Sequence, residues 1–251
     1  MTSTIEPAIF RRQDGHIHPV IMCGASVMGE RRDPDDQVAH FVRSPRGRTD
    51  FQEVLLWNMA DAGLAAPIVV VDQRYRFVVS EQLEDIGVAA SCVILEPSPH
   101  ARGTAAGLAM AALWLRSRDP GALMLVQPVD HAGHVPRQFH EAFALSLFSA
   151  HSGNIVSFGF DDPRRSGGNL FLMGPAPYLT ALRTKYPKLL HARERSFEGA
   201  LDGLGYLRPG PMMSGEPVLS VEEALEGLVD IALRVSIGDA RNVPDAAVSN
   251  R

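Results

Sequence analysis

The sequence predicts a doubly wound α/β fold with a mostly parallel sheet and a short helical C-terminal part. Over the first two thirds of the chain, short apolar runs rich in β-branched residues alternate with longer segments of helical spacing. The apolar runs are nearly continuous, which fits strands that are buried on both faces of a parallel sheet. Regular strand–helix alternation, joined by right-handed crossovers, is typical of α/β proteins.

The elements of the first two thirds can be assigned in order. Five apolar runs are the expected strands: residues 18–24, 67–72, 91–97, 122–128 and 154–160. The segments between them are the expected helices, and capping residues, Pro or Gly mark most of their ends. They cover residues 49–63, 76–87, 104–118 and 136–153.

The last third has a different pattern. Residues 166–174 indicate a strand or hairpin edge, and residues 176–201 a helix that is interrupted near Pro187. Residues 220–235 have helical spacing and begin with Ser followed three residues later by Glu, a capping-box signature. We therefore expect one domain over residues 1–235, with a core at about 18–175, a helical part at 176–235 and a flexible tail at 236–251.

Composition excludes several classes of protein. The 251 residues carry 24 basic and 29 acidic side chains, a net charge of −5, which argues against a nucleic-acid partner. Two cysteines, Cys23 and Cys92, exclude a disulfide scaffold and fit a reducing compartment. The first residues lack the apolar core of a signal peptide, and no apolar run reaches the ~18 residues of a membrane span. We expect a cytoplasmic protein without a membrane partner.

The loop after the first expected strand is one candidate binding site. In open α/β sheets, ligands bind at the carboxyl ends of the strands. Glycines in such a loop let backbone N–H groups approach a phosphate. The alternative is a plain turn between a strand and a helix. The candidate residues are Gly24, Ala25, Ser26 and Gly29.

A second candidate is Asp130, which follows the fourth expected strand. A carboxylate at this place could hold Mg2+ and position a phosphate, or it could cap the helix that begins near Pro136. Together with His131, His134 and His140, it could instead form the Zn2+ or Fe2+ site of a metal-dependent hydrolase, although their spacing matches no established ligand pattern.

A third candidate is the stretch from Glu96 to Thr104, after the third expected strand. Arg102 and Thr104 stand at the start of a helix, where they would suit a phosphate or a base. The alternative is that Thr104 is an ordinary N-cap residue.

Taken in order, these segments resemble the sugar-1-phosphate nucleotidyltransferases, most closely the mannose-1-phosphate guanylyltransferases. The resemblance covers about residues 18–160 and rests on the motifs HPVIMCGASVMGER, TDFQEVLLW, IVVVDQRYRFVVSEQLEDIG, ILEPSPHARGTAAGLAMAAL, LVQPVDH and IVSFGF. It implies a Rossmann-like core of the nucleotide-diphospho-sugar transferase type. The reaction it implies joins a sugar-1-phosphate to GTP and releases pyrophosphate.

The resemblance also implies roles for individual residues. If Val27-Met28 is an insertion in the family motif GGSGTR, Arg31 takes the position of the catalytic arginine. Asp130 would be the second catalytic residue and the ligand of Mg2+. The nucleotide would be bound by Gly24, Ala25, Ser26, Gly29, Glu96, Arg102 and Thr104.

Departures from the family pattern indicate weakened catalysis. Glu30 replaces a threonine and brings a like charge to a triphosphate loop, which costs free energy. The lysine of the family motif PKQF has no counterpart, and Gly103 stands where the family motif RNTA has asparagine. The later motifs FVEKP and DVGSW are also absent.

Three functions remain open. The first is a catalytically impaired or non-catalytic homologue that binds GTP or a GDP-sugar and forms a homo-oligomer or pairs with an active paralogue. The second is an active GTP-dependent guanylyltransferase that uses Mg2+. The third is the metal-dependent hydrolase with Asp130, His131 and His134.

Overall fold

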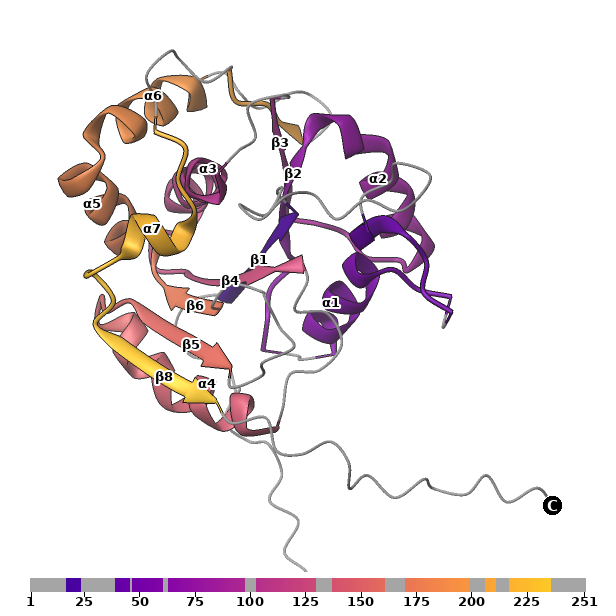
Figure 1. Ribbon diagram of the computed structural model, residues 1–251, viewed down its shortest axis with the longest axis horizontal. Helices are drawn as coiled ribbons and strands as arrows, with labels where there is room; N and C mark the ends of the chain where they lie inside the picture. Colours follow the sequence, from indigo (N-terminus) through magenta and orange to yellow (C-terminus); the bar gives the residue numbers. More distant parts are fainter. Residues whose placement is uncertain are drawn as a thin grey trace, which may run out of the picture.

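The structure is a computed structural model in which eight strands form one mixed sheet, with helices on both faces (Figure 1). It describes residues 17–23, 39–45, 47–60, 63–97, 103–129, 137–160, 170–198, 206–210 and 217–235. The strand order is β7-β3-β2-β1-β4-β6-β5-β8. The strands are β1 (Ile17–Cys23), β2 (Ile68–Asp72), β3 (Cys92–Glu96), β4 (Leu123–Pro128), β5 (Val156–Phe160), β6 (Leu170–Met173), β7 (Tyr206–Leu207) and β8 (Ile231–Val235).

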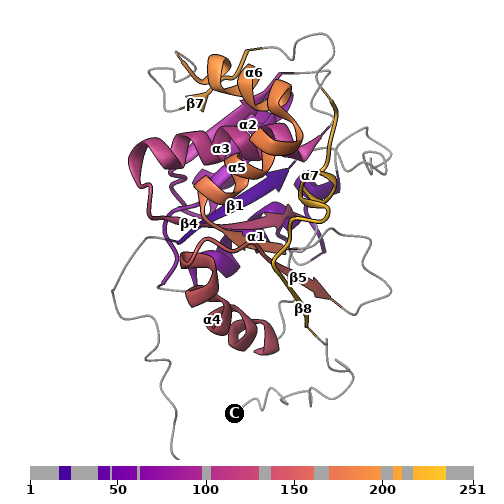
Figure 2. The same cartoon turned by 90° about the vertical axis from the view of Figure 1, so that its left-hand side faces the viewer.

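The helices lie in two layers. Helices α3, α5, α6 and α7 cover one face of the sheet, and α1, α2 and α4 cover the other (Figures 1 and 2). Their bounds are α1 (Asp50–Met59), α2 (Arg76–Asp85), α3 (Thr104–Arg118), α4 (Arg137–His151), α5 (Pro175–Lys185), α6 (Pro187–Phe197) and α7 (Val221–Leu225). Two short 3-10 helices, η2 (Ala39–Phe41) and η3 (Gln73–Tyr75), precede α1 and α2.

The sheet is parallel except around β6. Strands β3, β2, β1 and β4 pair in parallel, β7 adds to β3 in parallel, and β8 adds to β5 in parallel. Strand β6 runs antiparallel to both β4 and β5. The central strands are buried on both faces, which explains why their sequences are nearly continuous apolar runs. The predicted doubly wound, mostly parallel α/β fold is confirmed.

Successive residues of each strand face opposite helix layers, as the pleat requires. Val70 and Ile94 contact the layer of α3, whereas Val71 and Leu95 contact the layer of α1 and α2. By the same alternation, Asp72 and Glu96, the last residues of β2 and β3, lie on the face covered by α3.

Helix α3 is buried along most of its length. Every residue from Ala105 to Leu115 is buried, between the sheet and helices α5 and α6. A helix that is apolar on every side is found in the interior of a protein. The many alanines of α3 allow the neighbouring elements to pack closely against it. Tyr178 of α5 is fully buried against it and donates a hydrogen bond from its hydroxyl to the carbonyl of Ala105 at 2.8 Å.

The elements predicted for the first two thirds are present in the predicted order. Residues 166–174 contribute β6, and the predicted interruption near Pro187 separates α5 from α6. Helix α1 ends at Met59, earlier than the predicted end near residue 63, and the Ala60 N–H makes its last i→i−4 bond, to Leu56. The short strand β7 was not predicted, since two residues carry no periodicity.

The predicted helix at residues 220–235 is wrong. The capping box is present, with Ser220 accepting from the Glu223 N–H, but α7 ends at Leu225. A turn then passes through Gly227 at φ +71°, and the remaining residues form β8. A short apolar run fits both the helical and the strand period, so pairing with β5 decided the outcome. The C-terminal part is therefore mixed rather than helical.

The predicted tail at 236–251 lies outside the described residues. Within the part of the chain that the structure describes, no helix is both long and apolar enough to cross a membrane.

Substituting Gly107 by Ala should destabilise the fold, although Ala ordinarily stabilises a helix by up to about 1 kcal/mol. A Cβ at this position would lie 2.5 Å from Val70 Cγ1 and 2.8 Å from Glu96 Oε1, both on buried side chains. Overpacking of this kind costs roughly 1–3 kcal/mol. Urea unfolding should show a lower free energy of unfolding for the variant.

The matched control is Gly121→Ala, in the turn after α3, where the nearest atom to a new Cβ is 3.8 Å away. The free energy of unfolding of this control should stay close to that of the parent protein. A Gly107→Ala variant as stable as the parent would show that α3 stands farther from the sheet than described.

Candidate functional site

The carboxyl ends of β1, β2, β3 and β4 lie side by side along one edge of the sheet, because the four strands are parallel neighbours. The register pairs Asp72 with Glu96, so two carboxylates end adjacent strands on the same face. We call this the carboxyl edge. It is the place where ligands bind in open α/β sheets, and it is the place to which the sequence assigned the site.

Of the predicted site residues, the structure describes Glu96, Thr104 and His140. His140 is exposed on α4, where its ring lies 5.9 Å from that of Trp57 between centroids. The others lie outside the described residues, namely Gly24, Ala25, Ser26, Gly29, Arg31, Arg102, Asp130, His131 and His134. Their neighbours in the chain are described. Cys23 ends β1 and Val129 follows β4, so the loops that carry Gly24 and Asp130 both begin at the carboxyl edge.

Glu96 is a buried carboxyl group at the end of β3, with 6% of its surface exposed. Its side chain lies toward α3 at Gly107, where the missing Cβ leaves room for it. Burial raises the pKa of Glu96 to about 8; the positive charge of Arg193 opposes this rise and the negative charge of Asp72 adds to it. At neutral pH the protonated form therefore predominates, and Glu96 can donate a hydrogen bond.

Asp72 is also buried, with 5% exposed, but it has a closely bound cation. Its carboxylate accepts a hydrogen bond from the Arg74 backbone N–H at 2.8 Å and caps η3. The Arg74 guanidinium donates through Nε at 3.1 Å and through Nη2 at 3.0 Å. Sequence reasoning missed Asp72, although it ends the second apolar run just as Glu96 ends the third.

Arg193 brings a positive charge to this region from far along the chain. It lies on α6 with only 2% of its surface exposed, and it acts electrostatically on Glu96. Nothing in the sequence singled it out, because α6 reads as an ordinary charged helix. Only the packing of α6 against α3 reveals its place.

Thr104 is the first residue of α3, and Gly103 occupies the N-cap position. The Thr104 hydroxyl oxygen accepts a hydrogen bond from the backbone N–H of Val221 at 3.0 Å. The alternative interpretation of Thr104 as the N-cap is therefore wrong. Its side chain contacts the start of α7 instead.

The opposite face of the carboxyl edge contains a buried amide pair. Asn58 of α1 donates through Nδ2 to Gln127 Oε1 at 2.8 Å and to the Val54 carbonyl at 2.7 Å. Both amide side chains are almost fully buried. The pair fixes the end of β4 against α1, and thus the point from which the loop with Asp130 begins.

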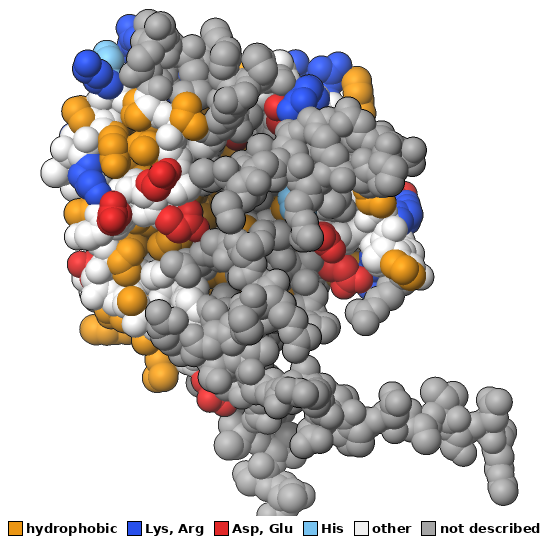
Figure 3. Space-filling view, in the orientation of Figure 1, with side chains coloured by type: hydrophobic (Ala, Val, Ile, Leu, Met, Phe, Trp, Pro, Cys, Tyr) orange, Lys and Arg blue, Asp and Glu red, His pale blue; other side chains and the backbone are white. Residues whose placement is uncertain are grey.

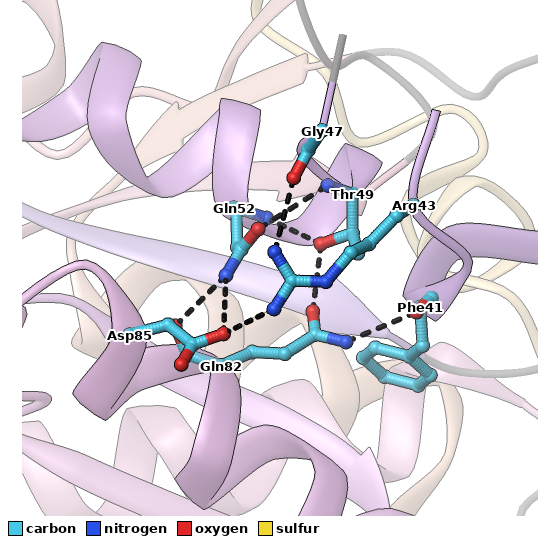
Figure 4. A network of polar contacts seen from close by, with 7 residues as sticks. All are labelled: Phe41, Arg43, Gly47, Thr49, Gln52, Gln82 and Asp85. Atoms are coloured by element: carbon cyan, nitrogen blue, oxygen red, sulfur yellow. Dashed lines mark hydrogen bonds and ion pairs between the residues drawn. The ribbon is translucent and has the colours of Figure 1, made fainter. Parts of the chain in front are cut away.

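A polar pocket of about 430 Å³ lies between α1 and α2, apart from the carboxyl edge. Figure 4 shows the network behind it, in which Arg43 bonds Asp85 at 2.5 Å and the Gly47 carbonyl at 3.0 Å. Deeper in the same network, Thr49 donates to Gln82, and Gln82 donates to the Phe41 carbonyl. These contacts brace η2, α1 and α2, and they include none of the predicted site residues.

The described residues do not by themselves form a metal site. No group of three or more His, Cys, Asp or Glu side chains gathers among them. At the carboxyl edge, the Asp72 carboxylate is already bound by the Arg74 guanidinium. The assignment of Mg2+ to Asp130 stays a prediction, as does the hydrolase site with His131 and His134.

Substituting Glu96 by Gln should flatten the pH dependence of stability. The pKa of Glu96 is near 4.5 in an exposed state and about 8 in the folded protein. Between these values the folded form alone retains the proton, so the free energy of unfolding falls as pH rises. Gln keeps the shape of the side chain but does not titrate. The Tm of Glu96→Gln minus the Tm of the parent protein should therefore increase from pH 5 to pH 8.

Exposed Glu84→Gln is the control, and its Tm difference from the parent should show no such trend. A Tm difference for Glu96→Gln that stays constant from pH 5 to 8 would mean that Glu96 ionises in the folded protein at its ordinary pKa.

Sequence comparison finds curated relatives but no matching family model. The chain is 33% identical over 161 residues to the alginate biosynthesis protein AlgA of Pseudomonas aeruginosa, covering 63% of this chain and 32% of AlgA. It is 35% identical over 148 residues to the mannose-1-phosphate guanylyltransferase of Sinorhizobium fredii, covering 57% of this chain and 28% of that protein. The chain thus matches about a third or less of the length of these relatives.

Solved structures share the fold. A Helicobacter pylori protein described as mannose-6-phosphate isomerase aligns with a TM-score of 0.66 at 17% identity, covering 89% of this chain and 98% of that one. A Thermus thermophilus protein described as mannose-1-phosphate geranyltransferase aligns with a TM-score of 0.62 at 19% identity, covering 88% and 73%. At these identities the likeness concerns the fold alone.

The relatives by sequence include a mannose-1-phosphate guanylyltransferase, the family that the motifs resemble, and the solved structures share the fold. Over part of its length, the chain is therefore similar to mannose-1-phosphate guanylyltransferase and related polysaccharide-biosynthesis proteins, and it shares the fold of the solved structures.

Proposed function

We propose that this chain binds GTP or a GDP-sugar at the carboxyl edge, as a catalytically impaired homologue of the mannose-1-phosphate guanylyltransferases. The observation that carries the proposal is the 35% identity to such an enzyme over 148 residues. Several of the motifs that resemble the family end at this edge, where β1, β3 and β4 end. Its place would be cytoplasmic nucleotide-sugar metabolism, as a homo-oligomer or beside an active paralogue.

Electrostatics supports impaired catalysis rather than lost binding. Nucleotidyl transfer depends on positioning and on neutralising the charge that develops on the phosphates. Glu30 adds a negative charge to the loop that would hold the triphosphate, and the family lysine is absent. Among the described residues of the edge, the Arg74 guanidinium is already ion-paired with Asp72. This guanidinium therefore does not replace the lost cation.

Retention of Asp130 supports a second candidate, an active guanylyltransferase. In that reaction, an oxygen of the sugar phosphate attacks the α-phosphorus of GTP and pyrophosphate leaves. Arg31 would stabilise the leaving pyrophosphate, and Asp130 would hold Mg2+, which would neutralise phosphate charge when bound. Gly24, Ala25, Ser26 and Gly29 would line the phosphates through their backbone N–H groups.

Purified chain mixed with GTP, mannose-1-phosphate and Mg2+ should bind GTP in calorimetry and release little or no pyrophosphate. The physical reason is the missing positive charge at the phosphate loop, which affects the chemical step more than binding. The control is Asp130→Ala, which should leave any background signal unchanged. Turnover that disappears in Asp130→Ala would establish the active enzyme instead, and absence of GTP binding would reject both readings.

Substituting Glu30 by Thr should tighten GTP binding. Two like charges about 4 Å apart cost about 1 kcal/mol in water, which corresponds to roughly fivefold in Kd. Titration calorimetry at low salt measures the change, and exposed Glu81→Thr on α2 is the control for charge alone. Unchanged or weaker affinity for GTP would place Glu30 away from the phosphates.

A further inference from the structure

Residues 217–221, which we call the strap, lie across the N-terminus of α3. The carbonyl of Leu219 accepts a hydrogen bond from the Ala105 N–H at 3.1 Å. Two residues later, the N–H of Val221 donates to the Thr104 hydroxyl oxygen at 3.0 Å. The strap, which lies more than a hundred residues further along the chain, thus accepts a hydrogen bond from one backbone N–H of the first turn of α3. It also donates one to a side-chain oxygen of the same turn.

Gly103 makes this approach possible. Its φ is +151°, and a Cβ at this position would lie 2.6 Å from the Leu219 oxygen and 2.7 Å from the Leu219 nitrogen. No side chain other than hydrogen fits there without moving the strap. The strap therefore contacts α3 backbone against backbone, which fixes their relative position more tightly than contact through flexible side chains.

The strap is itself anchored at its C-terminal end. Ser220 and Glu223 form a reciprocal capping box, with the Ser220 N–H donating to Glu223 Oε2 at 2.7 Å. Val221, Ala224 and Leu225 of α7 are buried in the same core as α3, and β8 follows in the sheet beside β5. Figure 3 shows acidic side chains gathered over α7, where Glu222 and Glu223 occupy its first turn.

We propose that the strap positions the first turn of α3 at the carboxyl edge for nucleotide binding, and that Thr104 is a positioning residue that acts through the strap. This inference rests on the proposed function. The Thr104 oxygen faces the strap, so its hydroxyl serves to hold Gly103–Ala105 in place. The part of the nucleotide site at the start of α3, which we assign to the base, then depends on residues 217–223.

The test compares two ligands that make different demands on the site. GMP carries a base, whereas inorganic pyrophosphate engages only the phosphate loop. Thr104→Val removes the acceptor for Val221 N–H and keeps the shape, and Thr104→Ser keeps the acceptor. Loss of one such hydrogen bond should weaken GMP binding roughly fivefold, with pyrophosphate affinity unchanged. Thr104→Ser should retain the affinity of the parent.

A second pair of variants loosens the strap without touching α3. Glu223→Ala removes half of the capping box, and exposed Glu226→Ala removes the same charge three residues later. Glu223→Ala should weaken GMP binding and speed hydrogen exchange at the Val221 amide, and Glu226→Ala should do neither. These readouts separate positioning from general destabilisation.

The possible outcomes are distinct. Faster exchange at Val221 in Thr104→Val and Glu223→Ala with unchanged GMP affinity would overturn the positioning role and leave the proposed function intact. Tighter GMP binding in these variants would show that the strap obstructs the site, and this result would also overturn the positioning role. A parent protein that binds neither GMP nor pyrophosphate would reject the proposed function itself.

Discussion

The burial of α3 is the constraint on which the rest of the structure depends. A helix buried from Ala105 to Leu115 must be covered on every side, so the sheet, α5, α6 and α7 all pack around it. Its close approach to the sheet requires Gly107, and that missing Cβ leaves the space in which Glu96 lies. Its N-terminus at the carboxyl edge requires Gly103, because the strap crosses there. The position of this helix thus determines the surroundings of the candidate site.

The charges at the carboxyl edge follow from the same packing. Burial beside α3 raises the pKa of Glu96, and Arg193 reaches this region only because α6 lies on α3. Asp72, one strand away, is ion-paired with Arg74 from the next turn of chain. A nucleotide arriving at this edge would therefore meet one neutral carboxyl group and one neutralised carboxylate, which is compatible with a polyanionic ligand even though it adds little attraction.

The sequence predicted the sheet well because its strands are buried on both faces, and this leaves an unambiguous apolar run. It failed at residues 231–235, where a half-exposed edge strand and an amphipathic helix have the same composition. At the site, local patterns pointed to Glu96 at the end of β3 and to Thr104 at the start of α3. They could not point to Arg193 or to the Thr104–Val221 contact, because these depend on long-range packing of a segment that resembles no motif.

Both edges of the sheet are completed by residues from the end of the described chain. Strand β7 adds to β3 at one edge, and β8 adds to β5 at the other. A nascent chain that has emerged only as far as β6 still lacks α5, α6 and α7 and therefore leaves one apolar face of α3 uncovered, which favours association with other chains. The portion that resembles the guanylyltransferases would likewise leave this face of α3 uncovered when expressed alone.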